Sequence, residues 1–337
     1  MRRRDVILGL LFATTVSRAQ AEQPAKVYRL AMVNPSEPAG EMSEAATHSP
    51  YWRAFFQRLR QLGYVEGQNL AVERYSAEGR TERFSELAAE VVRSGPDVIF
   101  VGGDRLAIAV KAATDAIPVV GIVADPVASG LVPNLARPGG NFTGVSVDAG
   151  AEFRGKQLEL LHEMLPAATR VAWLASAKIW EGQSAANFGA IGEVAQRLKI
   201  SLLGPPLNAP IQEAEYRRVI ASMVEQGADA LLVLDQPENL TNRRLIVKLA
   251  AEAKLPAMYG YPAFTEIGGL MAYGVDLADP LRYAASQVDQ ILKGTKPGEI
   301  PFYQATKFQL VINMKTAKAL GLTVPDSLLA RADVVIE

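Results

Sequence analysis

One stretch of the sequence, Pro96-Asp97-Val98-Ile99-Phe100-Val101-Gly102-Gly103-Asp104, decides the class of fold. Its consecutive apolar residues are typical of a strand that is buried on both faces, as in a parallel sheet. The two glycines end this strand, and the apolar periodicity of residues 104–114 predicts a helix directly after it. A second apolar strand is predicted at residues 118–123. This order predicts a parallel β-α-β unit.

The same alternation continues on both sides of this stretch. Further buried strands are predicted at residues 27–33, 70–75, 142–147, 170–175, 229–234, 256–259, 270–275 and 308–312. Helices are predicted at residues 51–62, 84–92, 182–198, 211–226, 239–253, 281–292 and 314–320. In the first of these, Trp52, Phe55 and Phe56 share the apolar face, which predicts core positions. The sequence therefore predicts an α/β protein with doubly wound parallel sheets.

The length of the chain indicates more than one domain. It has 337 residues, 49% of them apolar, which exceeds the usual size of a single domain. The turn-rich segment Arg137-Pro138-Gly139-Gly140-Asn141 precedes a strand, and we expect the chain to cross from one lobe to the other soon after it.

The N-terminus has the pattern of a signal peptide. A basic start, Met1-Arg2-Arg3-Arg4, is followed by apolar residues 6–16 and by Ala19-Gln20-Ala21, which predicts cleavage after Ala21. The apolar run is too short to cross ~30 Å of hydrocarbon as a helix. Arg3 and Arg4 also fit the twin-arginine export signal, and the general and twin-arginine routes both stay open. Residues 1–21 therefore predict export to the periplasm, without a membrane-embedded segment in the mature chain.

The composition excludes several functions. Lys plus Arg number 35 and Asp plus Glu number 36, so the net charge gives no reason to expect nucleic acid as a partner. The chain has no cysteine and only two histidines, which have no partners at metal-ligand spacing. No phosphate-binding loop, dinucleotide fingerprint or nucleophile elbow is found. We therefore expect a binding protein with no catalytic residues, no cofactor and no metal.

Candidate binding residues follow the predicted strands, because ligands of open α/β sheets bind beyond the carboxyl ends of the strands. The candidates in the first half of the chain are Asn34, Ser36, Asp104, Arg105 and Asp125. Those in the second half are Ser176, Trp180, Asp235, Gln236 and Tyr261. Both halves offer polar and aromatic side chains, which predicts a small amphipathic ligand.

Each of these residue types also has a structural alternative that the sequence leaves open. Asp104 can cap the helix that it begins, and Asp235 can stabilise a turn. Arg105 can face solvent instead of clamping a ligand carboxylate. Trp180 and Tyr261 can pack against the protein instead of stacking on a ligand.

Several separated segments resemble one protein family and occur in the family's order. They are Ala116-Ile117-Pro118-Val119-Val120, Leu135-Ala136-Arg137-Pro138-Gly139-Gly140-Asn141-Phe142-Thr143-Gly144, Ile291-Leu292-Lys293-Gly294-Thr295-Lys296-Pro297 and Lys315-Thr316-Ala317-Lys318-Ala319-Leu320-Gly321-Leu322. The chain resembles ABC transporter substrate-binding proteins, specifically those related to tryptophan- and other aromatic amino acid-binding proteins. Many relatives carry a small hydroxylated residue and a proline where this chain has Asp104-Arg105, so their amino acid specificity does not carry over directly.

The resemblance implies a type I periplasmic-binding fold with two lobes and a three-segment hinge. Residues 26–145 and 276–303 would form lobe 1, and residues 146–275 and 304–337 would form lobe 2. The hinge would include Gly144, Ser146, Tyr273 and Asp276.

The expected function is that of the periplasmic solute-binding component of an ABC importer. It would bind an amino acid or aromatic compound by hinge closure. Its partners would be that solute and the importer's permease and ATPase, and a monomer would suffice to present both lobes. A receptor that passes ligand occupancy to a signalling partner is the alternative, which the sequence does not separate from transport.

Overall fold

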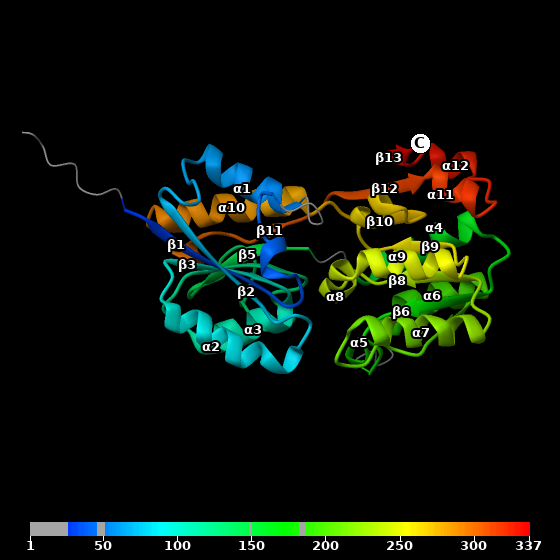
Figure 1. The fold of residues 1–337 in the computed structure, drawn as a ribbon, viewed down its shortest axis with the longest axis horizontal. Helices are drawn as coiled ribbons and strands as arrows, with labels where there is room; N and C mark the ends of the chain where they lie inside the picture. The colour runs from blue at the N-terminus through cyan, green and yellow to red at the C-terminus, as the bar shows by residue number, and fades with distance from the viewer. Residues whose placement is uncertain (1–25, 46–50, 148–149, 182–186) are drawn as a thin grey trace, which may run out of the picture.

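The computed structural model describes residues 26–45, 51–147, 150–181 and 187–337. The predicted signal peptide and His48 lie outside these residues. The described chain forms two β-sheets that lie side by side, each covered by helices on both faces (Figure 1). The α/β class predicted from the sequence is therefore confirmed. We call the six-stranded sheet with its helices lobe 1, and the seven-stranded sheet with its helices lobe 2.

The sheet of lobe 1 has the strand order β11-β5-β4-β3-β1-β2, and its strands pair in parallel. The strands are β1 (Tyr28–Asn34), β2 (Leu70–Ser76), β3 (Val98–Gly102), β4 (Val119–Val123), β5 (Phe142–Ser146) and β11 (Tyr303–Gln304). The buried apolar runs of the sequence form the central strands, because helices cover both faces of the sheet.

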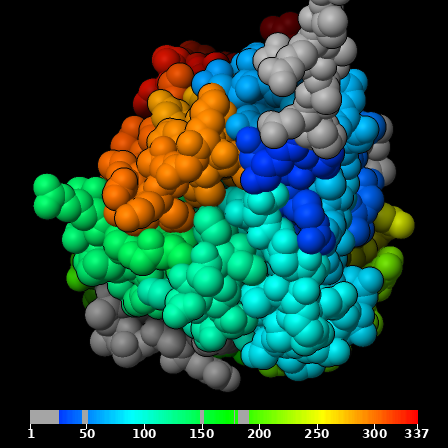
Figure 2. Space-filling model, turned by 90° about the vertical axis from the view of Figure 1, so that its left-hand side faces the viewer, coloured from blue at the N-terminus to red at the C-terminus, as the bar shows by residue number. Residues whose placement is uncertain are grey.

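Alternate residues of each central strand face different helices. Leu30 and Met32 of β1 pack with α1 (Tyr51–Gln61) and α10 (Ala278–Leu292), whereas Ala31 and Val33 pack with α2 (Phe84–Ser94) and α3 (Asp104–Ala113). Figure 2 shows α10, in orange, beside α1, in blue, at this end of the molecule. A helix from late in the sequence thus completes the lobe that the N-terminal half begins.

The sheet of lobe 2 has the strand order β13-β12-β10-β9-β8-β6-β7. Its strands are β6 (Arg170–Leu174), β7 (Ser201–Leu203), β8 (Ala230–Val233), β9 (Ala257–Tyr259), β10 (Met271–Val275), β12 (Phe308–Asn313) and β13 (Val334–Ile336). The pairing of β10 with β12 is antiparallel, unlike the other strand pairs given for this sheet. The reason is that β12 enters this lobe directly from β11 in lobe 1, without a crossover helix that would return it to the parallel direction.

Helices cover both faces of the second sheet. One face packs against α4 (Gly150–Met164), α6 (Asn187–Leu198), α11 (Met314–Ala319) and α12 (Asp326–Leu329), and the other against α7 (Glu213–Glu225) and α9 (Arg243–Glu252). The predicted helix 239–253 is divided at Asn242 into α8 (Pro237–Thr241) and α9. The remaining short helices are α5 (Ala177–Glu181), η1 (Ala39–Glu41), η2 (Thr81–Arg83), η3 (Pro262–Ile267) and η4 (Pro297–Glu299). Within the described ranges, no helix has the length and apolarity needed to cross a membrane.

Three connections join the lobes in the described part of the chain, and of the four predicted hinge residues only Ser146 and Asp276 lie at them. Gly144 lies inside β5, paired with Gly121, and Tyr273 lies inside β10, paired with Leu310. Both residues therefore belong to sheets and not to the connections. Ser146 ends β5, where its hydroxyl donates to the carbonyl of Ala124 (2.7 Å). The connections run from Ser146 to α4, through Asp276 from β10 to α10, and from β11 to β12.

Candidate functional site

Two adjoining cavities lie where the lobes face each other. A polar cavity of about 430 Å³ and an apolar pocket of about 140 Å³ share part of their lining, and we call them together the interlobe cleft. The shared lining residues are Pro35, Gly103, Asp104 and Ala124 from lobe 1 and Arg154, Asp235 and Pro237 from lobe 2. Apart from Arg154, which lies in the second turn of α4, these residues lie near the carboxyl ends of strands or at the start of a helix, as expected for an open α/β sheet. The cleft has the size of a small-molecule site.

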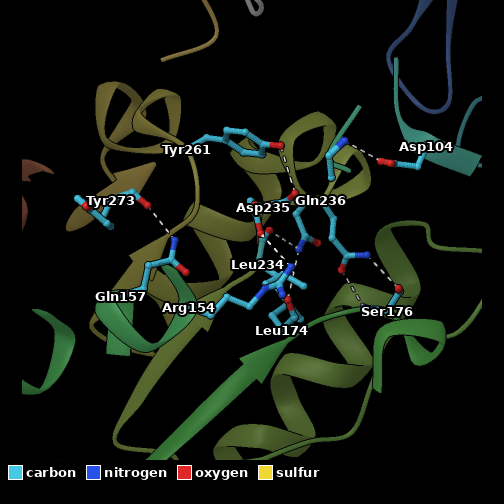
Figure 3. A network of polar contacts seen from close by, with 12 residues as sticks. Asp104, Arg154, Gln157, Leu174, Ser176, Leu234, Asp235, Gln236, Tyr261 and Tyr273 are labelled. Atoms are coloured by element: carbon cyan, nitrogen blue, oxygen red, sulfur yellow. Dashed lines mark hydrogen bonds and ion pairs between the residues drawn. The ribbon is translucent and has the colours of Figure 1, made fainter. Parts of the chain in front are cut away.

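The polar cavity contains an incompletely satisfied pair of opposite charges. Arg154, in the second turn of α4, points toward Asp235, which follows β8 (Figure 3). Its Nη2 atom lies 4.0 Å from Oδ1 of Asp235, beyond hydrogen-bond distance. Nε of Arg154 and Oδ1 of Asp235 are buried atoms without a hydrogen-bond partner in the structure. A buried donor and a buried acceptor are thus available beside the same cavity.

The wall behind this pair is held by side-chain amides. Gln236 donates to the hydroxyl of Ser176 (2.9 Å) and accepts from the N–H of Ser176 (2.9 Å), which joins the ends of β8 and β6. The buried Asn239 donates to the carbonyl of Leu234 (3.0 Å) and accepts from the hydroxyl of Tyr216 (2.9 Å). These hydrogen bonds fix the backbone on either side of Asp235 and so orient its carboxylate.

Three carboxylates, those of Asp104, Asp235 and Glu238, line the polar cavity. Burial raises the pKa of Asp104, although its Oδ2 accepts from the N–H of Ala124 (3.0 Å). Burial also raises the pKa of Glu238, against the opposing charge of Arg105. The hydroxyl of Tyr261 donates to the carbonyl of Asp235 (3.2 Å), and burial together with the nearby Asp235, Glu238 and Asp104 raises its pKa. A positive group placed beside these carboxylates would favour their charged forms.

The lining of the apolar pocket combines aromatic and aliphatic side chains. Tyr51, Trp52 and Phe100 are in ring contact and form an aromatic wall, and Tyr261 also lines the pocket. The aliphatic lining consists of Ile122, Val123, Val147, Leu240, Leu277 and Leu281. Glu37 is 3% exposed, and its two oxygens accept from the hydroxyl of Tyr51 (2.9 Å) and from Nε1 of Trp52 (2.7 Å). The aromatic wall is thereby tied to the loop that follows β1.

Most of the predicted binding residues meet in the interlobe cleft. The lining of the polar cavity includes Asp104, Arg105, Ser176, Asp235 and Gln236, and the lining of the apolar pocket includes Asn34 and Tyr261. The guanidinium of Arg105 is exposed and lies 5.6 Å from the ring centre of Phe84. The side chain of Asn34 accepts from the N–H groups of Ser36 (3.0 Å) and Glu37 (2.8 Å), so it also shapes its own turn.

Three predicted residues do not line the cleft. The hydroxyl of Ser36 lies 2.7 Å from that of Thr241 and donates to the carbonyl of Pro237 (3.2 Å), so it bridges the two lobes. Asp125 accepts from the N–H groups of Val127 and Ala128 and caps its own turn. Trp180 packs on Trp173, with ring centres 5.2 Å apart, against the core of lobe 2. Trp180 thus takes the packing alternative named from the sequence, and Asp125 stabilises its own turn.

Several cleft residues escaped the sequence reasoning. Arg154 was missed because it follows a crossing between the lobes and not a strand end. Trp52 was assigned to the core from its helical spacing, and it does belong to the core cluster of lobe 1, but its place in the lining of the apolar pocket was not predicted. Glu37 follows the end of β1 by three residues, so the rule that points to strand ends was the signal available for it. Among the described residues, no group of three or more His, Asp or Glu side chains is placed to hold a metal ion.

Asp104→Asn is expected to raise the melting temperature of the ligand-free protein at pH 7. Burial raises the pKa of Asp104, so folding favours the protonated form of this carboxyl group. The stability gained from protonation is fully present below the ordinary pKa of 3.8 and is lost as the pH rises through the raised pKa. Asparagine keeps the acceptor for the N–H of Ala124 without the buried charge. Thermal unfolding between pH 4 and pH 8 should show the two proteins converging toward acid pH. A variant less stable than the wild type at pH 7 would contradict this account.

Comparison with known proteins places the chain in a family. The chain is 26% identical over 272 residues to a tyrosine-binding protein of Clostridioides difficile, covering 80% of this chain and 76% of that protein. The structure of a conserved domain protein from Vibrio cholerae matches with a TM-score of 0.77 and 26% identity, over 92% of this chain and all of that one. The ABC domain of a Streptococcus pneumoniae protein in complex with L-Trp matches with a TM-score of 0.76 and 24% identity, over the same shares. Residues 51–336 match the profile of the ABC transporter substrate binding protein family, and the chain belongs to that family.

Proposed function

We propose that this protein is an exported receptor that closes its two lobes over one amino acid and presents it to an ABC importer. The family membership and the amino acid named for the Clostridioides difficile relative support this proposal. The interlobe cleft supplies the chemistry, because its lining combines opposite charges in one cavity with an apolar pocket beside them. Amphipathic ligands have the same two parts.

The observation that carries the proposal is the separated pair Arg154–Asp235. Across 4.0 Å, neither Nε of Arg154 nor Oδ1 of Asp235 has a hydrogen bond. An α-amino acid carries a carboxylate acceptor and an ammonium donor on one carbon atom, so it can satisfy the arginine and the aspartate together. Asp104 and Glu238 add negative charge on the side that would receive the ammonium. Leaving such buried groups unsatisfied costs free energy, which ligand binding would recover.

The apolar pocket would receive the side chain of the amino acid. It adjoins the polar cavity through Asp104, Arg154 and Asp235, which line both spaces. The side chain of an amino acid bound at the charged pair could therefore extend into the apolar pocket toward Trp52 and Phe100. Burying that side chain supplies affinity, and the charged pair fixes its orientation.

Export and transport complete the proposal. The basic and apolar N-terminal pattern in residues 1–21 supports delivery to the periplasm. Closure over the ligand would bring the cleft-facing surfaces of both lobes together, and an importer that binds this form preferentially would read ligand occupancy as a shift in population. Ser36, which contacts Pro237 and Thr241 across the lobes, would support the closed form.

A ligand screen on the protein from Glu22 onward tests the proposal. After unfolding and refolding to remove any ligand carried through purification, L-phenylalanine, L-tyrosine and L-tryptophan are compared with 2-phenylethylamine and 3-phenylpropionate. A ligand at 100 times its Kd adds about 2.7 kcal/mol of stability, which shifts the melting temperature by several degrees. We expect a shift with at least one amino acid and a much smaller one with the analogues that lack a carboxylate or an ammonium group. Equal shifts with the analogues, or none with any amino acid, would refute the proposed function.

A further inference from the structure

We infer that Glu37 is the positioning residue that makes the apolar pocket selective for an aromatic side chain. It would do so by fixing Tyr51 and Trp52 as one rigid wall. This inference rests on the proposed function, since it concerns the side chain of the amino acid whose charged groups meet Arg154 and Asp235. It goes further by naming the residue that would enforce the choice of an aromatic side chain.

Glu37 is placed by the turn that follows β1. The side chain of Asn34 accepts from the N–H of Glu37 (2.8 Å), which directs the glutamate side chain into lobe 1. There each carboxylate oxygen accepts one hydrogen bond. Oε1 accepts from the hydroxyl of Tyr51 (2.9 Å), and Oε2 accepts from Nε1 of Trp52 (2.7 Å). Hydrogen bonds to a charged acceptor are stronger than those between neutral groups. Two adjacent rings of α1 are therefore held by a single carboxylate.

Packing fixes the rest of the Trp52 ring. Its centre lies 5.5 Å from that of Phe100 at an interplanar angle of 76°, and 6.0 Å from that of Phe55 at 90°. Trp52 is 3% exposed, so little of the ring is free to move. A side chain entering the pocket meets this preorganised aromatic surface together with aliphatic groups such as Leu277 and Leu281, which pack in the same cluster.

A pocket of this construction favours a ring over a branched aliphatic chain. Edge-to-face and offset contacts between aromatic rings contribute beyond the area that they bury, provided that the rings keep a suitable geometry. A glutamate can fix that geometry because it offers one acceptor to each donor. Glutamine has a single acceptor oxygen and two N–H donors, so in its place one of the two rings loses its acceptor.

The test compares the affinities for L-phenylalanine and L-leucine, measured by calorimetry on the refolded protein. We expect the wild type to bind L-phenylalanine about tenfold more tightly than L-leucine, from ring contacts of the usual strength. Glu37→Gln should reduce this ratio about threefold or more, mainly through weaker L-phenylalanine binding. Tyr51→Phe, which removes one donor and leaves the carboxylate in place, should reduce the ratio in the same direction and decides the matter if Glu37→Gln fails to fold. Glu86→Gln, an exposed position of α2, is the matched control and should leave the ratio unchanged.

A purely structural role for Glu37 would predict a different result. In that case Glu37→Gln would lower the melting temperature and both affinities together, with an unchanged ratio, and this outcome would overturn the inference. A wild type that binds L-leucine as tightly as L-phenylalanine would also overturn it while leaving the proposed function intact. A wild type that binds no amino acid would refute the proposed function and the inference with it.

Discussion

Arg154→Ala is expected to lower the affinity for the bound amino acid by about 100-fold. Arg154 is the only cation that lines both parts of the interlobe cleft among the described residues, and its Nε is buried without a hydrogen-bond partner. Removing it would take away the group proposed to hold the ligand carboxylate and would leave Asp235 without its opposite charge. Truncating one partner of a desolvated charged contact typically costs 2–5 kcal/mol of binding free energy, and about 2.7 kcal/mol corresponds to 100-fold. Calorimetric titration of the refolded variant measures the change.

Arg105→Ala is the matched control for this prediction. Arg105 lines the same polar cavity, but its guanidinium is exposed and lies over Phe84. Its removal should change the affinity less than about threefold, because exposed charges are well screened. Asp235→Asn keeps the size of the side chain and should weaken binding in the same way as Arg154→Ala. Comparable losses for Arg105→Ala and Arg154→Ala would show that overall positive charge, and not the Arg154–Asp235 pair, attracts the ligand.

Gly144→Ala is expected to destabilise the fold by about 3 kcal/mol or more, with little soluble protein as the practical result. A Cβ atom on Gly144 would lie 2.0 Å from the carbonyl oxygen of Gly121 and 2.6 Å from its nitrogen. Both atoms belong to the backbone of the adjacent strand β4, so no side-chain rotation can relieve the contact. Overpacking at a backbone contact of this kind belongs to the severe class of substitutions. Chemical denaturation, compared with the wild type, gives the change in unfolding free energy.

Gly40→Ala separates this effect from the general cost of replacing glycine. A Cβ atom there would have no other atom within 4 Å, so the free energy of unfolding should change by less than about 0.5 kcal/mol. The comparison also tests what Gly144 does. If Gly144 served as a flexible hinge, its alanine variant would remain stable and would change the ligand affinity instead. A stable Gly144→Ala protein would therefore contradict the packing role that the structure assigns to this residue.

The order of strands and helices was predictable from the sequence because burial imposes it locally. A strand covered on both faces must be apolar throughout, so Val98–Gly102 and Ala230–Val233 stand out from the polar turns around them. The short edge strands β7, β11 and β13 were not predicted. Val334 and Val335 of β13 are exposed, so their positions carry little of the apolar signal that burial requires.

The candidate site was predictable only in part. Strand ends in an α/β sheet point to the same edge, and this rule selected Asp104, Asp235 and Gln236, which line the polar cavity. It also selected Asp125 and Trp180, which lie outside the lining of the cleft because a residue after a strand can turn back onto its own loop or pack onto its own core. It also could not reach Arg154, which enters the cleft from a helix after a crossing between the lobes.

The sequence by itself determined the class of fold, the family, the absence of cysteine chemistry and the set of strand ends among which a site would lie. These follow from composition, from local periodicity and from motifs that are contiguous in the chain. Only the tertiary structure decided that Arg154 and Asp235 face each other at 4.0 Å, that Glu37 holds two rings, and that Ser36 joins the lobes. Arg154 and Asp235 are 81 positions apart, and Ser36 and Thr241 are 205 positions apart. Arg154 and Asp235 meet within lobe 2, and Ser36 and Thr241 meet across the two lobes. Their proximity depends on tertiary packing, which no local pattern in the sequence encodes.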